Sequence, residues 1–171
     1  MPDPSTKVSA LQTGEVDWVD NPLFDLVPQL RKMSGVKVEV FDTLGVIAVV
    51  GMNHLYPPFN NQKLRQALLL ATNQQDVIDA VLGEVSELGK VGAGFFTLGT
   101  PNASLAGMEK IMGPRNIAAA KKAVAESGYK GEKIILMSPS DLASLQAIAQ
   151  VTDAMFKSIG LNVEYTSMDW G

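Results

Sequence analysis

The chain has no cysteine and only one histidine, His54, among its 171 residues. The absence of cysteine excludes disulfide bonds and thiolate metal sites, although it does not identify the cellular compartment. A zinc site or a Ser-His-Asp triad would have to use His54, yet no second imidazole and no G-x-S-x-G turn accompanies it. We therefore interpret His54 as a structural or surface residue.

Positive charge and long apolar runs are also scarce. The 14 Lys and Arg residues are outnumbered by 18 Asp and Glu residues, which gives a net charge of −4 (14 − 18). Because phosphate binding needs a concentrated basic face, nucleic acid is not an expected partner. The longest apolar stretch, residues 46–52, is far shorter than the ~20 residues of a membrane helix. The opening MPDPSTK lacks the apolar core of a secretory signal.

Two glycine-rich stretches approach cofactor-binding motifs without matching them. GEVSELGK at 83–90 has five residues between its glycines, where a phosphate loop has four, and Val91 replaces the Ser or Thr that binds magnesium. GAGFFTLG at 92–99 misses the dinucleotide-binding spacing. Asp17, Asp20 and Asp25 fit no calcium-loop spacing. The sequence thus predicts no cofactor and no metal site.

What the sequence does contain is a succession of helix and strand patterns. Apolar periodicity predicts one helix that ends near Thr13 and further helices over residues 23–30, 61–72, 73–82, 114–127 and 138–159. It predicts strands at residues 16–18, 36–40, 44–52, 133–137 and 161–165. The glycine-rich residues 84–113 are expected to form a long, functional or partly mobile loop. This order predicts an α/β fold with a mixed sheet of about five strands and flanking helices, in which the last strand–helix–strand unit is parallel.

Capping residues mark the expected helix starts. Asn60 or Asn61 is expected to cap one helix and Asn73 the next. Pro114 suits the first position of a third helix. The run Ser138-Pro139-Ser140-Asp141 has the order of an N-cap, a first-turn proline and a carboxylate, which predicts a helix start at residue 138.

Several segments together resemble a known protein family. They are ALQTGEVDW (10–18), NHLYPPFNNQKLRQALLLATNQQDVIDAVLGE (53–84), GPRNIAAAKKAVAESGYKG (113–131), KIILM (133–137) and IAQVTDAMFKSIGLNVEYTSMDWG (148–171). In this order they resemble the dipeptide/oligopeptide-type extracellular solute-binding proteins of ABC importers, family 5. Two features depart from that pattern: Asn73 stands where the family usually has Asp, and residues 92–113 do not match the common peptide binders. The ligand class therefore stays open.

The resemblance implies a fold and a function. It implies that residues 1–171 form one lobe of a type II periplasmic-binding-protein-like fold, as a fragment of a larger two-lobed protein. That protein would be the non-enzymatic, substrate-binding component of an ABC transporter, and it would capture peptides or similar small solutes for import. Its partners would be the ligand and a membrane permease, in the periplasm or another extracytoplasmic space.

The candidate ligand-binding residues lie at the carboxyl ends of the last two predicted strands, where open α/β sheets bind ligands. They are Ser138, Ser140, Asp141, Asp169 and Trp170. A helix start at Ser138 would offer free backbone N–H groups to a carboxylate. The alternative is that Ser138 and Asp141 only cap that helix.

The loop supplies two further candidates, Phe95 and Phe96, which we expect near the same edge either as core residues or as a ligand wall. Two other functions remain open. One is a small independent α/β enzyme that uses the loop at 84–113 as a lid, although no nucleophile–base pair supports it. The other is an interaction module that pairs through an exposed strand edge.

Overall fold

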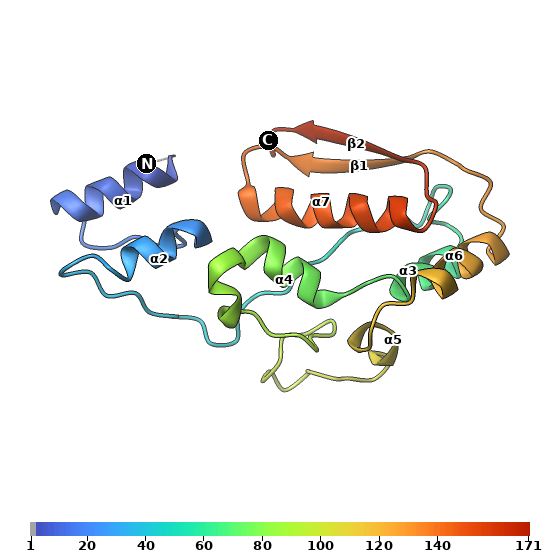
Figure 1. The fold of residues 1–171 in the computed structure, drawn as a ribbon, viewed down its shortest axis with the longest axis horizontal. Coiled ribbons are helices and arrows are strands. Elements are labelled where there is room, and N and C mark those ends of the chain that lie inside the picture. The colour runs from blue at the N-terminus through green and yellow to red at the C-terminus, as the bar shows by residue number, and fades with distance from the viewer. Residues whose placement is uncertain (1–2) are drawn as a thin grey trace.

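A computed structural model describes residues 3–171 (Figure 1). The regular elements in chain order are α1 (Pro4–Thr13), η1 (Phe24–Leu26), α2 (Val27–Leu30), α3 (Gln62–Leu69), α4 (Gln74–Leu82), η2 (Gly83–Leu88), α5 (Glu109–Met112), α6 (Ile117–Glu126), β1 (Ile134–Pro139), α7 (Ala143–Ser158) and β2 (Val163–Met168). No helix within residues 3–171 combines the length and apolar character needed to cross a membrane.

Asparagine side chains start α3 and α4, as the sequence predicts. Asn61 Oδ1 accepts hydrogen bonds from the backbone amides of Lys63 and Leu64, at 3.0 and 3.3 Å. Asn61 Nδ2 also donates to the carbonyl of Ser127 at 2.7 Å, which ties the start of α3 to the end of α6. Asn73 Oδ1 accepts one bond, from the amide of Gln75. Asn61 therefore caps α3 and connects it to the end of α6, whereas Asn73 caps α4 alone.

We expect Asn61→Ala to lower the free energy of unfolding by more than Asn73→Ala. Loss of a helix cap costs about 0.5–2 kcal/mol, and Asn61→Ala also removes the bond to the Ser127 carbonyl. Urea unfolding of both variants beside the parent chain would measure the difference. An equal or smaller loss for Asn61→Ala would show that the bond to Ser127 contributes nothing.

Two predicted helix starts are wrong. α6 begins at Ile117 rather than Pro114, because Asn116 caps it by accepting a bond from the amide of Ala119 at 2.9 Å. α7 begins at Ala143 rather than Ser138, and its N-cap residue, Leu142, makes no side-chain capping bond. The Ser-Pro-Ser-Asp run thus resembled a cap, but Ser138 instead continues β1, where it pairs with β2.

The sheet within residues 3–171 has two parallel strands, not about five. Its register places Ile134 opposite Val163 and Pro139 opposite Met168. The helix α7 connects the two strands and packs on β1, which confirms the parallel strand–helix–strand unit. At the entry of the sheet, Lys133 Nζ contacts Glu164 Oε2 at 2.6 Å. This hydrogen bond and the negative charge raise the pKa of Lys133.

The predicted strands at 16–18, 36–40 and 44–52 are absent from the described residues. Residues 36–41 and 45–53 follow an irregular path, and many of their apolar side chains are exposed, with Val46 94% exposed. A strand exists only where a neighbouring chain accepts and donates its ladder of hydrogen bonds. Residues 3–171 provide no neighbouring strand for these segments, so the predicted strands do not form.

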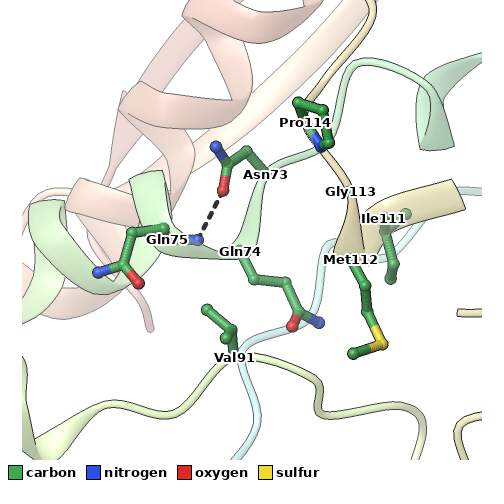
Figure 2. A pocket seen from close by; sticks show the side chains of 8 residues that line it. All are labelled: Asn73, Gln74, Gln75, Val91, Ile111, Met112, Gly113 and Pro114. Carbon is green, nitrogen blue, oxygen red and sulfur yellow. Dashed lines mark hydrogen bonds between the residues drawn. The ribbon is translucent and has the colours of Figure 1, made fainter. Parts of the chain in front are cut away.

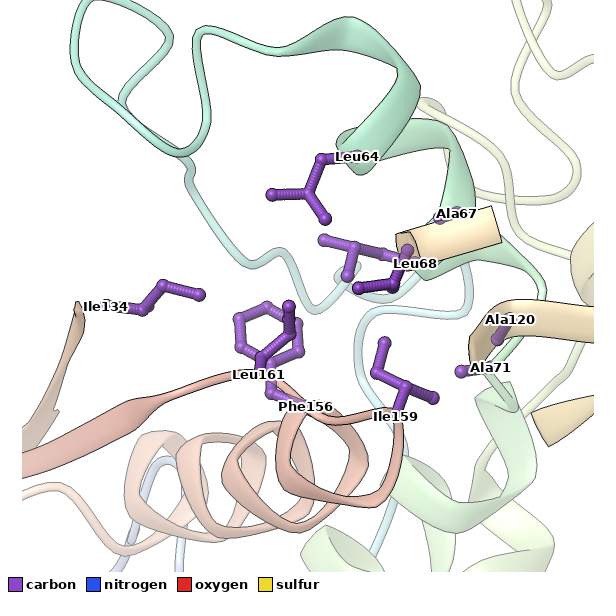
Figure 3. Close-up of a cluster of buried hydrophobic side chains, with 10 residues drawn as sticks. Leu64, Ala67, Leu68, Ala71, Ala120, Ile134, Phe156, Ile159 and Leu161 are labelled. Carbon is purple, nitrogen blue, oxygen red and sulfur yellow. The ribbon is translucent and has the colours of Figure 1, made fainter. Parts of the chain in front are cut away.

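The core forms where α3, α6 and α7 meet the entry end of the sheet (Figure 3). Its buried members are apolar residues of these elements and the turns beside them: Leu64, Ala67, Leu68, Ala71, Ala120, Val124, Ile134, Phe156, Ile159 and Leu161. The rings of Phe156 and Phe59 pack with their centroids 6.1 Å apart. The core thus fixes the sheet and α7 relative to the helices around it.

The elements stack in layers. The helix α7 contacts both β1 and α4, and Figure 1 shows the sheet, α7 and α4 in that order, with the long loop between η2 and α5 beyond α4. The carboxyl ends of β1 and β2 lie on the opposite side of α7 from this loop (Figure 1). The fold therefore separates the two groups of candidate site residues.

Candidate functional site

The parallel pairing brings the ends of β1 and β2 side by side. After the last register pair, the amide of Ser140 donates to the carbonyl of Met168 at 2.8 Å, so the two chains leave the sheet together. Figure 1 shows both arrowheads at the same end of the sheet, close to the C-terminus. The structure thus brings together residues 140–141 and 169–170, which are about thirty positions apart in the sequence.

Two hydrogen bonds link the residues beyond the strands. Ser140 Oγ donates to Asp169 Oδ1 at 2.7 Å, and the amide of Trp170 donates to Asp141 Oδ1 at 3.0 Å. All four residues are exposed, and no salt bridge within residues 3–171 involves either carboxylate. This edge therefore presents two exposed carboxylates without a salt-bridge partner, together with the exposed side chain of Trp170, which suits a ligand with a positive group and an apolar part. We call Ser140, Asp141, Asp169 and Trp170 the strand-exit cluster.

Ser138 is separated from this cluster by burial. Its side chain is 0% exposed, and its Oγ accepts a hydrogen bond from the Tyr165 hydroxyl at 2.6 Å. The interpretation that Ser138 and Asp141 cap a helix is wrong, since α7 starts at Ala143. Ser138 instead joins β1 to β2 through side chains, and in this structure it is closed to a ligand.

We expect Tyr165→Phe to cost about 1–3 kcal/mol, because it leaves the Ser138 hydroxyl buried without its donor. Urea unfolding would measure the loss, with Tyr56→Phe as the matched control because the Tyr56 ring is exposed. Equal stabilities of the two variants would mean that Ser138 finds another partner when Tyr165 cannot donate.

Phe95 and Phe96 do not join the strand-exit cluster. Their rings pack edge to face with centroids 5.1 Å apart in the loop beyond α4, and Phe95 is 82% exposed. The loop is held there by Gln74, whose Nε2 donates to the Ala93 carbonyl at 2.7 Å and whose Oε1 accepts from the Gly92 amide at 2.6 Å. Gln74 therefore anchors the loop to α4, away from the strand ends.

The same anchor borders a pocket of about 300 Å³ that sequence analysis did not predict (Figure 2). Its lining consists of amide, apolar and backbone groups of α4, the loop and the end of α5: Asn73, Gln74, Gln75, Val91, Ile111, Met112, Gly113 and Pro114. None of these side chains is an acid, a base or a nucleophile. The only sequence signal for this pocket was the pair of glutamines that follows the Asn73 cap.

Within residues 3–171, no three His, Cys, Asp or Glu side chains are arranged to bind a metal ion. His54 is exposed, in agreement with its interpretation as a surface residue.

Comparison with known proteins identifies the family. The model for bacterial extracellular solute-binding proteins, family 5 (middle), matches residues 1–171. A probable peptide ABC transporter periplasmic-binding protein of Sinorhizobium fredii is 37% identical over 170 residues, which are 99% of this chain and 32% of that protein. The periplasmic oligopeptide-binding protein of Escherichia coli (strain K12) is 30% identical over an alignment of 174 positions that covers 96% of this chain and 31% of that protein.

The fold has a counterpart among solved structures. An ABC transporter substrate binding protein of Listeria monocytogenes superposes with a TM-score of 0.81 over 99% of this chain and 34% of that chain, at 24% identity. These relatives are binding proteins of transporters rather than enzymes, and this chain spans about a third of their length. The resemblance seen in the sequence is confirmed: this chain belongs to the bacterial extracellular solute-binding proteins of family 5.

Proposed function

We propose that this chain is part of the substrate-binding component of an ABC transporter, which captures peptides or similar small solutes for import. The observation that carries this proposal is the family match over residues 1–171 together with a 37% identical relative named as a peptide-binding protein. The relatives named as periplasmic support a periplasmic or extracytoplasmic location.

The strand-exit cluster is the proposed ligand edge. A peptide carries a positive amino terminus at neutral pH, and Asp141 and Asp169 provide two exposed carboxylates without a cation beside them. Each carboxylate is held by one hydrogen bond, which orients it before a ligand arrives. The indole of Trp170, 68% exposed, offers an apolar surface for a side chain of the ligand.

Capture is proposed to be non-catalytic. Two lobes close around the solute, and the closed form docks on a membrane permease. Because the chain spans about a third of the relatives' length, it supplies only part of the contacts that such a closure makes. We therefore expect residues 1–171 alone to bind peptides very weakly or not at all.

Calorimetric titration of the 171-residue chain with di- to pentapeptides tests this expectation. Heats no larger than those of dilution are expected at peptide concentrations up to the millimolar range. Micromolar binding by this chain alone would contradict the proposal that the ligand needs contacts from a second lobe.

The second candidate function is an enzyme that uses the loop at 84–113 as a lid, and the pocket beside that loop is the observation that favours it. The lining side chains provide no acid–base pair, which weighs against this function. Turnover assays with esters, amides and phosphates would test it, with Gln75→Ala as a variant in the pocket lining. Turnover that is lost on this substitution would support an enzyme.

A further inference from the structure

Residues 37–52 have an extended sequence pattern but no backbone pairing. No backbone–backbone hydrogen bond within residues 3–171 involves any of them. Two backbone amides of the segment are bonded to a side chain instead, since Asp42 Oδ1 accepts hydrogen bonds from the amides of Leu44 and Gly45. Both edges of this segment therefore present rows of free N–H and C=O groups.

Most side chains of this segment are also exposed, although Val38, Ile47 and Met52 are half-buried and Met52 packs against the core. Val46 is 94% exposed and Val49 is 71% exposed, and they lie within the apolar run 46–50. An extended chain that is apolar at successive positions is apolar on both faces, as in a strand buried inside a sheet. Residues 36–40 differ, because valines alternate there with Lys37 and Glu39, so that one face is polar. Residues 36–40 are thus suited to a half-exposed strand, and residues 46–50 to an interior strand.

We propose that residues 45–52 form an interior β-strand, and residues 36–40 a half-exposed strand, that pair with β-strands of the same polypeptide outside residues 1–171. Free backbone groups on both edges need a matching row of donors and acceptors, which an extended strand provides. The relatives and the Listeria structure place a matching region inside single chains about three times as long, so such strands have a source. The inference rests on family membership and does not depend on the identity of the ligand.

A second copy of this chain is the less suitable occupant. Pairing of two copies through residues 45–52 would cover one edge of each strand and leave the other edge open to further addition, which leads to aggregation. It would also leave apolar faces on both copies in contact with water. Strands from the same polypeptide can cover both edges at once.

Hydrogen exchange tests the proposal in two proteins. One is the monomeric 171-residue chain, and the other is a chimera in which this chain replaces the matching third of the Sinorhizobium fredii relative. We expect the amides of residues 46–50 to exchange at nearly the rate of an unstructured peptide in the chain, and at least ~100-fold more slowly in the chimera. Slow exchange in the monomeric chain would overturn the proposal, as would protection that appears only when the chain dimerises, or fast exchange in a folded chimera.

A substitution pair gives an independent readout. Val46→Lys should lower the urea midpoint of the chimera and leave that of the isolated chain unchanged, because the side chain is covered only in the longer protein. The control Leu105→Lys alters another exposed apolar residue, in the long loop, and should move neither midpoint. If the chimera does not fold, the urea midpoint of the isolated chain still tests the proposal. A clear fall in that midpoint with Val46→Lys would show that residues 3–171 already bury this side chain, and would contradict the proposal.

Discussion

Replacing Phe156 by alanine is expected to lower the free energy of unfolding by about 3–5 kcal/mol, the usual cost of removing a buried phenyl ring. Phe156 is 3% exposed and contacts Phe59 in the core that joins α7 to the other helices. Single domains are stable by only about 5–15 kcal/mol. The substitution therefore removes a large share of the stability, and urea unfolding followed by circular dichroism would measure it.

The matched control for this prediction is Phe95→Ala. Phe95 is 82% exposed in the long loop, so its removal should change the free energy of unfolding by less than about 0.5 kcal/mol. Comparable losses for Phe156→Ala and Phe95→Ala would mean that the cluster around α3, α6 and α7 is not the core. A loss at Phe95 alone would mean that the loop is packed against the rest of the chain.

The second large effect concerns the proposed ligand edge. In a protein of family length that carries this chain, the double substitution Asp141→Asn and Asp169→Asn should weaken peptide binding about 10- to 100-fold. Hydrogen bonds to charged groups contribute about 1.5–3 kcal/mol, and every 1.4 kcal/mol is a factor of ten in affinity. Asparagine keeps an oxygen that can accept from the Trp170 amide and from Ser140 Oγ, so the loss should come from charge rather than from unfolding.

Two controls separate this effect from general electrostatics. Asp17→Asn removes an exposed carboxylate far from the strand exits in the sequence and should leave affinity unchanged. Acetylation of the peptide amino terminus should weaken binding to the parent protein and have little further effect on the double variant. Equal affinities of the parent and the double variant would contradict the assignment of the strand-exit cluster as the ligand edge.

Local features of the fold could be predicted from the sequence because they depend on neighbouring residues. The caps Asn61 and Asn73 accept bonds from amides two or three positions away, and the end of α1 at Gly14 needs only the left-handed conformation that glycine adopts readily. Local signals also mislead when two readings are possible. Ser138 and Pro139 look like a helix start, yet strand pairing extends β1 through both residues.

Features that depend on distant partners could not be predicted in the same way. The sheet of about five strands was wrong because residues 36–52 have a strand pattern but no neighbour within residues 3–171. The placement of Phe95 and Phe96 depends on the bonds of Gln74 to residues 92 and 93, which no periodicity reveals. By contrast, residues 140–141 and 169–170 meet because parallel strands share a carboxyl edge, which the strand–helix–strand order does reveal. Their role in ligand binding stays a prediction.

The role of this chain in solute capture is tested most directly by calorimetric titration of the chimera with peptides of two to five residues, beside the isolated 171-residue chain. We expect saturable, one-to-one binding by the folded chimera and none by the chain alone. A folded chimera that binds no peptide, while the unmodified Sinorhizobium fredii relative binds one under the same conditions, would contradict the proposal that this chain contributes to the capture of peptides.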